Sequence, residues 1–192
     1  MERVLSFGAV ALLLIASASD MSAQGKISGF AAIGATSATG DLKDADSTKS
    51  GFFAQGGLEY KLSEPLWLRF DASMGWNDRI GSYAEDAYIW TFVARAQYWL
   101  PMGSESLRPY VNGGGGLMLY KRNPGETGLE DTPAFETKQR MMVSGGVGLD
   151  YRIGSTSLFV EGRYDLGFKK SDEEGSGRAL IPIMIGARWG AW

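Results

Sequence analysis

The 192-residue chain contains no cysteine and no histidine. Without cysteine there is no disulfide to hold an exported domain together, so ordinary packing or a membrane must do so. Without histidine the chain lacks the most common general base and the most common metal ligand, and Ser-His and Cys-His nucleophiles are excluded. The sequence therefore predicts no catalytic residue, no cofactor and no metal site.

Long apolar runs and clusters of basic residues are also missing from the body of the chain. A transmembrane helix needs about 20 predominantly apolar residues, and no stretch beyond the N-terminal region approaches that length. The formal charge is −3, and no basic patch accumulates that would attract nucleic acid. We expect neither a transmembrane helix nor a nucleic-acid partner.

The first residues have the pattern of a secretory signal peptide. Glu2 and Arg3 precede an apolar stretch over residues 4–16, which is too short to span a bilayer as a helix. Small residues follow, and we predict cleavage after Ala23, with Ala18 as the alternative site. The signal peptide would then comprise residues 1–23, and residues 24–192 would form one domain.

The rest of the chain alternates between apolar and polar residues with a period of two, which is typical of β-strands. Long and short connections alternate, so a meander of antiparallel strands would carry all its long loops at one end. Outer-membrane barrels have this asymmetry, with long loops outside the cell and short periplasmic turns. We predict an all-β fold, an eight-stranded antiparallel up-and-down transmembrane β-barrel. Its strands are expected at residues 26–38, 52–62, 66–77, 88–100, 107–120, 141–152, 158–168 and 179–189.

Away from the strand ends, the charged residues of the strands fall on one face. A basic residue facing lipid at mid-depth costs roughly 2–4 kcal/mol, so this face is expected to point into the barrel. Its cations are mainly arginine, which suits buried pairing with carboxylates, and its glycines leave room for long side chains. The predicted interior charge network consists of Glu59, Lys61, Arg69, Asp71, Arg95, Arg140, Asp150, Glu161, Arg163, Asp165 and Arg188.

Aromatic residues on the apolar face gather near the strand ends. Their amphipathic rings favour the two headgroup layers of a bilayer, where membrane barrels carry aromatic girdles. This distribution favours lipid around the barrel over an apolar core within it. The predicted membrane-interface aromatics are Trp76, Tyr88, Trp90, Tyr98, Tyr151, Phe168 and Trp189.

Residues 108–117, Arg-Pro-Tyr-Val-Asn-Gly-Gly-Gly-Gly-Leu, resemble the Pro-Tyr-Val-Gly-rich strand of the small eight-stranded outer-membrane β-barrel family. That family includes outer membrane protein X and the barrel domain of outer membrane protein A. The segment from Gly186 to Trp189 is similar to the terminal-strand signal read by the barrel-assembly machinery, although Trp192 follows in a different frame. The resemblance implies a monomeric barrel inserted in outer-membrane lipid, with both termini in the periplasm. It implies no activity, because relatives of this fold differ in function.

The predicted function is that of an integral outer-membrane barrel with a plugged polar interior and no enzymatic activity. Asp71, Glu161 and Asp165 could do acid–base work, but arginines on the same face favour pairing instead. Four long loops would offer a surface for contact with other molecules, and they carry formal charges of −1, −2, −1 and 0. No residue in them specifies a ligand. Two alternatives remain: a narrow porin-like channel for ions or small solutes, and a soluble lipocalin-like barrel that binds apolar ligands.

Overall fold

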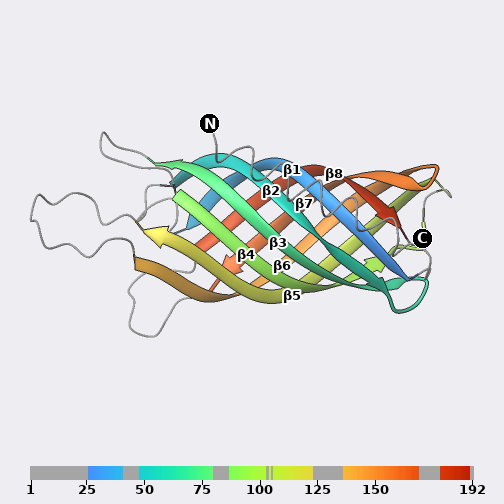
Figure 1. Cartoon of the computed structure of the whole chain (residues 1–192), viewed down its shortest axis with the longest axis horizontal. Coiled ribbons are helices and arrows are strands. Elements are labelled where there is room, and N and C mark those ends of the chain that lie inside the picture. Colours follow the sequence, from blue (N-terminus) through green and yellow to red (C-terminus); the bar gives the residue numbers. More distant parts are fainter. Residues whose placement is uncertain are drawn as a thin grey trace, which may run out of the picture.

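The chain folds into a closed barrel of eight antiparallel strands, seen from the side in Figure 1. The computed structural model describes residues 26–40, 48–79, 87–102, 104, 106–122, 136–168 and 178–190. The predicted signal peptide, Trp192 and the central parts of the four long loops lie outside these residues. The strands are β1 (Ile27–Gly40), β2 (Thr48–Lys61), β3 (Leu66–Arg79), β4 (Ala87–Trp99), β5 (Leu107–Arg122), β6 (Glu136–Ile153), β7 (Thr156–Gly167) and β8 (Arg178–Gly190).

Each strand pairs with the next along the chain, and β1 pairs with β8 to close the sheet. Closure leaves no unpaired strand edge, which is the condition for a sheet to cross a bilayer. The predicted eight-stranded antiparallel barrel is thus confirmed. No helix among the described residues is long and apolar enough to cross a membrane.

The β5–β6 hairpin extends further than the sequence predicts. Its ladder continues to the pair Arg122 and Glu136, whereas the prediction began the sixth strand at residue 141. Polar residues break the apolar alternation there, and the prediction relied on that alternation. Main-chain hydrogen bonds do not depend on it, so the ladder can continue where the side chains no longer alternate.

Three short turns connect the strands at one end of the barrel, and the strand ends that border the long connections lie at the other end (Figure 1). In the β6–β7 turn, Gly154 has a φ of 64°, a left-handed conformation that glycine adopts without a steric penalty. In the β2–β3 turn, the main-chain nitrogens of Leu62 and Ser63 both donate to the oxygen of Leu66. These local interactions help to fix the register of these two hairpins.

The outer surface of the barrel carries a belt of large apolar side chains. Phe52, Ile33 and Val147 are 78%, 68% and 63% exposed, and similar residues occur on all eight strands. Proteins in water rarely expose contiguous apolar patches larger than a few hundred Å². The belt therefore indicates an apolar environment around the barrel, as the alternation predicts.

We expect Phe92→Arg to prevent assembly or to lower the free energy of unfolding by about 2–4 kcal/mol, because Phe92 lies on this belt in the middle of β4. Met102→Arg is the matched control, since Met102 is 64% exposed but follows β4 in a turn. Heat-modifiable gel migration reports folding, and urea unfolding in lipid vesicles reports stability. Efficient folding of Phe92→Arg would contradict a lipid-facing belt.

Candidate functional site

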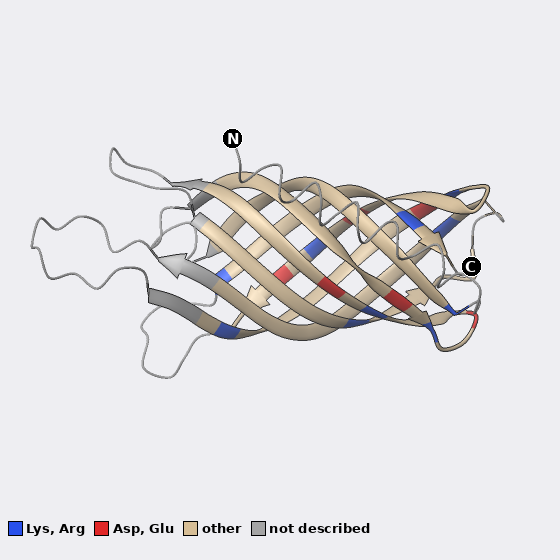
Figure 2. Ribbon diagram, viewed as in Figure 1, with Lys and Arg blue, Asp and Glu red and all other residues tan. Residues whose placement is uncertain are grey.

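The interior of the barrel holds a cluster of buried ionic side chains. In Figure 2, the Asp and Glu residues of the strands lie in the middle of the barrel and toward the short turns. Glu161 on β7 is at the centre of one part. Its Oε2 accepts a hydrogen bond of 2.6 Å from Nη1 of Arg69 on β3 and one of 2.7 Å from the hydroxyl of Tyr110 on β5. Three strands are tied together by one carboxylate oxygen.

A second part of the cluster is centred on Asp71 and Asp165. Arg95 on β4 binds Asp71 on β3 with two nitrogens, Nε at 2.8 Å and Nη2 at 3.3 Å. Its Nη1 donates to the hydroxyl of Ser144, which in turn donates to Asp165. Arg163 lies 3.4 Å from Asp165 and 3.6 Å from Glu161, so it joins the two parts.

A third part lies nearer the short turns and is centred on Arg188 of β8. Its Nε is 2.7 Å from Glu59 Oε2, and its Nη1 donates to Asp150. Ser28 and Ser157 donate to the same two carboxylates, at 3.2 and 2.7 Å. Every carboxylate of the cluster therefore has an arginine partner, which is the condition for enclosing charge at tolerable cost.

The remaining two predicted network residues lie at the ends of the barrel. Lys61 is the last residue of β2, and its Nζ is 2.7 Å from Oε1 of the exposed Glu64. The hydrogen bond from Lys61 and the charge of its ammonium group lower the pKa of Glu64 below its ordinary value. Arg140 is buried near the opposite end, where its Nη1 donates to the main-chain oxygen of Phe168 at 3.0 Å.

The interior is not polar alone, which departs from the predicted polar plug. Three apolar clusters lie inside the barrel. The first lies toward the long-loop end and comprises Ala38, Ile89, Val93, Met118, Met142 and Leu180. The second comprises Phe30, Ala32, Phe53, Phe159 and Met184. The third lies toward the short turns and comprises Trp67, Trp99 and Tyr110. The signal was present in the sequence, because Phe53, Trp67 and Phe159 share the face that carries the charges.

The aromatic rings and the guanidinium groups pack against one another. The Cζ of Arg69 lies 4.0 Å from the ring centroid of Phe30, and Arg188 lies 5.0 Å from that of Phe159. Trp99 contacts two cations, Arg108 at 4.5 Å and Arg188 at 5.1 Å. Cation–π contacts of this kind gain strength when the cation is desolvated, so the rings compensate part of the hydration that the arginines lose.

Two inward-facing glycines show why the interior contains so many of them. A Cβ atom on Gly146 would lie 2.6 Å from Cγ of Arg163. A Cβ atom on Gly148 would collide with the ring of Tyr110. Glycine on one wall therefore provides the space that a long side chain from another wall fills, as the sequence predicts.

The predicted membrane-interface aromatics point outward at the strand ends. Tyr88, Tyr98, Tyr151 and Phe168 are exposed, and Trp76, Trp90 and Trp189 are half-buried. Trp189 pairs with Gly29 of β1 across the closing seam of the barrel. Gly186, also on β8, pairs with Ala32. Trp192, the other residue of the predicted assembly signal, lies outside the described residues.

Among the described residues, no group of three or more carboxylates is arranged to hold a metal ion. The buried carboxylates contact arginines, serines and a tyrosine. The chemistry that this arrangement performs is electrostatic: it neutralises charge within a low-dielectric interior and links strands that are distant in sequence.

A closed antiparallel barrel with paired charges inside and apolar side chains outside defines a small transmembrane β-barrel. The model of the outer membrane protein beta-barrel domain family matches residues 8–164. The chain belongs to this family, and its family and fold point to a bacterial outer membrane. No protein with a curated description matches the chain.

Solved structures of outer-membrane barrels share the fold. Neisserial surface protein A is 18% identical with a TM-score of 0.64, over 86% of this chain and 96% of that one. Ail of Yersinia pestis is 13% identical with a TM-score of 0.56, over 86% and 97%. The N-terminal barrel domain of OprF from Pseudomonas aeruginosa is 15% identical with a TM-score of 0.50, over 85% and 98%. These likenesses show the fold.

The family and the structural neighbours confirm the predicted membership of the small outer-membrane barrels. They disfavour the soluble lipocalin-like alternative, in which the apolar face would line a cavity. The exposed apolar belt agrees, because the structure turns that face outward.

We expect Glu161→Ala to lower the free energy of unfolding by about 3–5 kcal/mol, because the substitution removes the acceptor shared by Arg69 and Tyr110 and leaves charge enclosed. Glu64→Ala removes the exposed partner of Lys61 and should change stability little. Urea unfolding of the barrel in lipid vesicles measures both. Equal losses for the two variants would contradict a structural role for the interior pairs.

Proposed function

We propose that the protein is a structural barrel of the bacterial outer membrane with a sealed interior, and that its four long loops contact other molecules outside the cell. One observation carries the first part: side chains from all eight strands fill the interior with paired charges and apolar clusters. An eight-stranded barrel is narrow enough for side chains to fill it completely. The loops then remain as the part of the molecule that is free to interact.

The order of the interior layers supports a seal against ions. Toward the long loops, the cluster that contains Ile89, Met118 and Met142 stands between the charge network and the outside. Toward the short turns, Trp67 and Trp99 pack edge to face, with ring centroids 6.0 Å apart. An ion crossing the barrel would have to displace these apolar side chains. A narrow channel is the alternative, and it requires these layers to move.

The same contacts support a role without catalysis. Glu161 and Asp71 are each bound by an arginine, and a carboxylate held in such an ion pair is poorly placed to transfer a proton to another group. We also propose export by the N-terminal signal peptide, insertion by the barrel-assembly machinery through the terminal strand that contains Trp189, and a monomeric state. The exposed tyrosines at the strand ends would anchor the barrel at the two headgroup layers.

The charge of the loops narrows the kind of molecule they contact. Ail of Yersinia pestis has been crystallised with a heparin analogue, sucrose octasulfate. The four long loops of this chain together carry an excess of acidic residues. Such loops repel polyanions, so we propose partners that are neutral or basic and not sulfated sugars.

Planar bilayers containing the wild-type protein should carry no steady current above that of the bare lipid. Arg69→Ala, Arg95→Ala and Arg163→Ala each remove a cation from the interior charge network. Lys61→Ala removes a cation at the short-turn end of the barrel and serves as the control. A steady wild-type current that the three interior substitutions alter would contradict the sealed interior and favour the channel.

The absence of cysteine makes the orientation directly testable by labelling. Thr127 falls in the long connection between β5 and β6, and Ser63 falls in the short β2–β3 turn. Each is replaced by cysteine in a separate variant. On intact cells, a membrane-impermeant maleimide should label Thr127→Cys and leave Ser63→Cys unlabelled, and both should react after lysis. The opposite pattern on intact cells would show that the long loops face the periplasm.

A further inference from the structure

The lipid-facing wall of the barrel is hollowed across β1 to β5. A cavity of about 810 Å³ lies over these strands, open to the outside. Its floor is made of small outward-facing residues: Gly56 pairs with Ala72 across β2 and β3, and Ala94 pairs with Gly115 across β4 and β5. We call this feature the outer groove.

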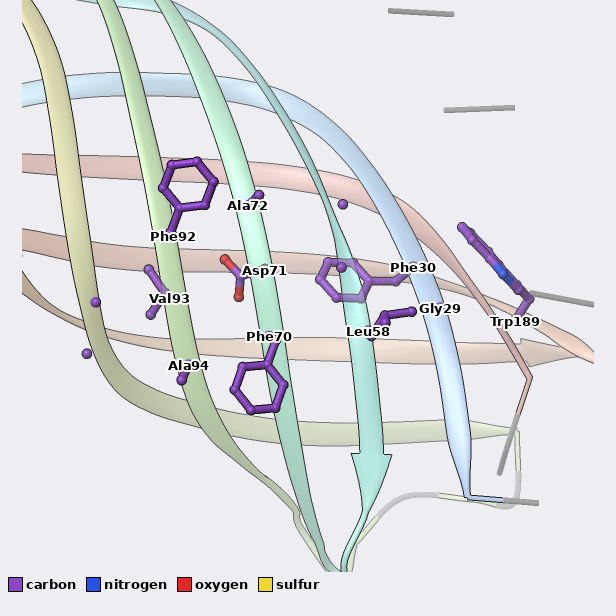
Figure 3. A pocket seen from close by; sticks show the side chains of 14 residues that line it. Gly29, Phe30, Leu58, Phe70, Asp71, Ala72, Phe92, Val93, Ala94 and Trp189 are labelled. Atoms are coloured by element: carbon purple, nitrogen blue, oxygen red, sulfur yellow. The ribbon is translucent and has the colours of Figure 1, made fainter. Parts of the chain in front are cut away.

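Large rings bound the outer groove. Phe70 and Phe92 are 52% and 46% exposed and stand above the small residues of the floor. Figure 3 shows their rings at one end and Trp189 at the other, with Leu58 between. Trp189 lies close against Gly29, where a Cβ atom would be 2.8 Å from its Nε1. The outward-facing side chains that line the groove are all apolar.

The position of the groove along the barrel fixes the leaflet that it faces. Gly29 and Trp189 lie near the ends of β1 and β8 at the short-turn end, and Phe92 lies in the middle of β4. The groove therefore runs from the short-turn end to mid-depth. With the short turns in the periplasm, this half of the barrel contacts the periplasmic leaflet.

We propose that the outer groove is a binding site for one acyl chain of a phospholipid in the periplasmic leaflet. Its position on the lipid-facing belt and the apolar side chains that face outward along it point to an acyl chain as the occupant; Asp71, which also lines the cavity, is buried and bound by Arg95. A second barrel is convex, and the projecting rings of Phe70 and Phe92 hold it away from the floor. This proposal rests on the proposed membrane location of the barrel and does not depend on a sealed interior. A current in the planar-bilayer experiment would therefore leave it unchanged.

Packing is the interaction that would hold an acyl chain in the outer groove. Acyl chains are as apolar as the groove, so no hydrophobic driving force favours the groove over bulk lipid. A chain seated between Phe70 and Phe92 gains dispersion contacts on several sides, whereas a chain on a convex wall gains them on one. The site is expected to hold one lipid more firmly than the rest of the belt does.

The floor can be filled without disturbing the wall. A Cβ atom on Gly56 would lie 3.6 Å from the main-chain oxygen of Phe30, an ordinary van der Waals contact, so Gly56→Leu projects into the groove. Ala72→Leu fills the same floor from β3 without replacing a glycine. Gly145→Leu is the matched control: Gly145 is exposed on β6 outside the groove, and its Cβ would lie 3.8 Å from the oxygen of Asn112.

The test is native mass spectrometry of the barrel released into mild detergent from vesicles of palmitoyl-oleoyl phosphatidylethanolamine and phosphatidylglycerol. Wild type and Gly145→Leu should retain one phospholipid per barrel. In Gly56→Leu and Ala72→Leu, the fraction of barrels that retain a phospholipid should fall about tenfold. Heat-modifiable migration checks that each variant is folded, and Ala72→Leu suffices if Gly56→Leu does not fold. Equal retention in all folded variants overturns the proposal. So does a wild-type dimer that the groove variants abolish, because the occupant is then a second copy of the chain.

Discussion

The structure depends on pairing buried arginines with buried carboxylates inside a closed sheet. Lipid outside the barrel forbids charge on the outer face, so the charges of the strands must turn inward, where little water remains to hydrate them. An arginine enclosed without a partner would cost several kcal/mol. The barrel meets this requirement by giving each carboxylate of the network an arginine and several of them a hydroxyl donor as well.

This constraint explains the composition of the interior. Guanidinium groups need flat partners, and Phe30, Phe159 and Trp99 provide ring faces on which Arg69 and Arg188 pack. Long side chains need space within a narrow barrel, and inward-facing glycines provide it. Apolar clusters fill the volume on either side of the charges. The result is an interior packed with side chains that hold the strands together across the barrel.

The outer wall is more differentiated than a uniform apolar belt. Glycine and alanine replace large residues across five strands, and the neighbouring rings deepen the hollow that they leave. Alternation predicts that these positions face lipid, but it does not predict that they lie together. Gly56 and Gly115 are far apart in sequence, and only the strand order places them on the same wall.

The sequence by itself determined the period of two, the sharing of one face by the charges, and the alternation of long and short connections, because these follow from local patterns along each strand. Those features were sufficient to predict the eight-stranded barrel and to predict which side chains point inward and which point outward. The tertiary structure alone decided which arginine meets which acid. Arg69 and Glu161 are 92 residues apart and join only because closure and shear of the sheet bring β3 opposite β7. The interior aromatic layers and the outer groove likewise exist only once all eight strands are in register.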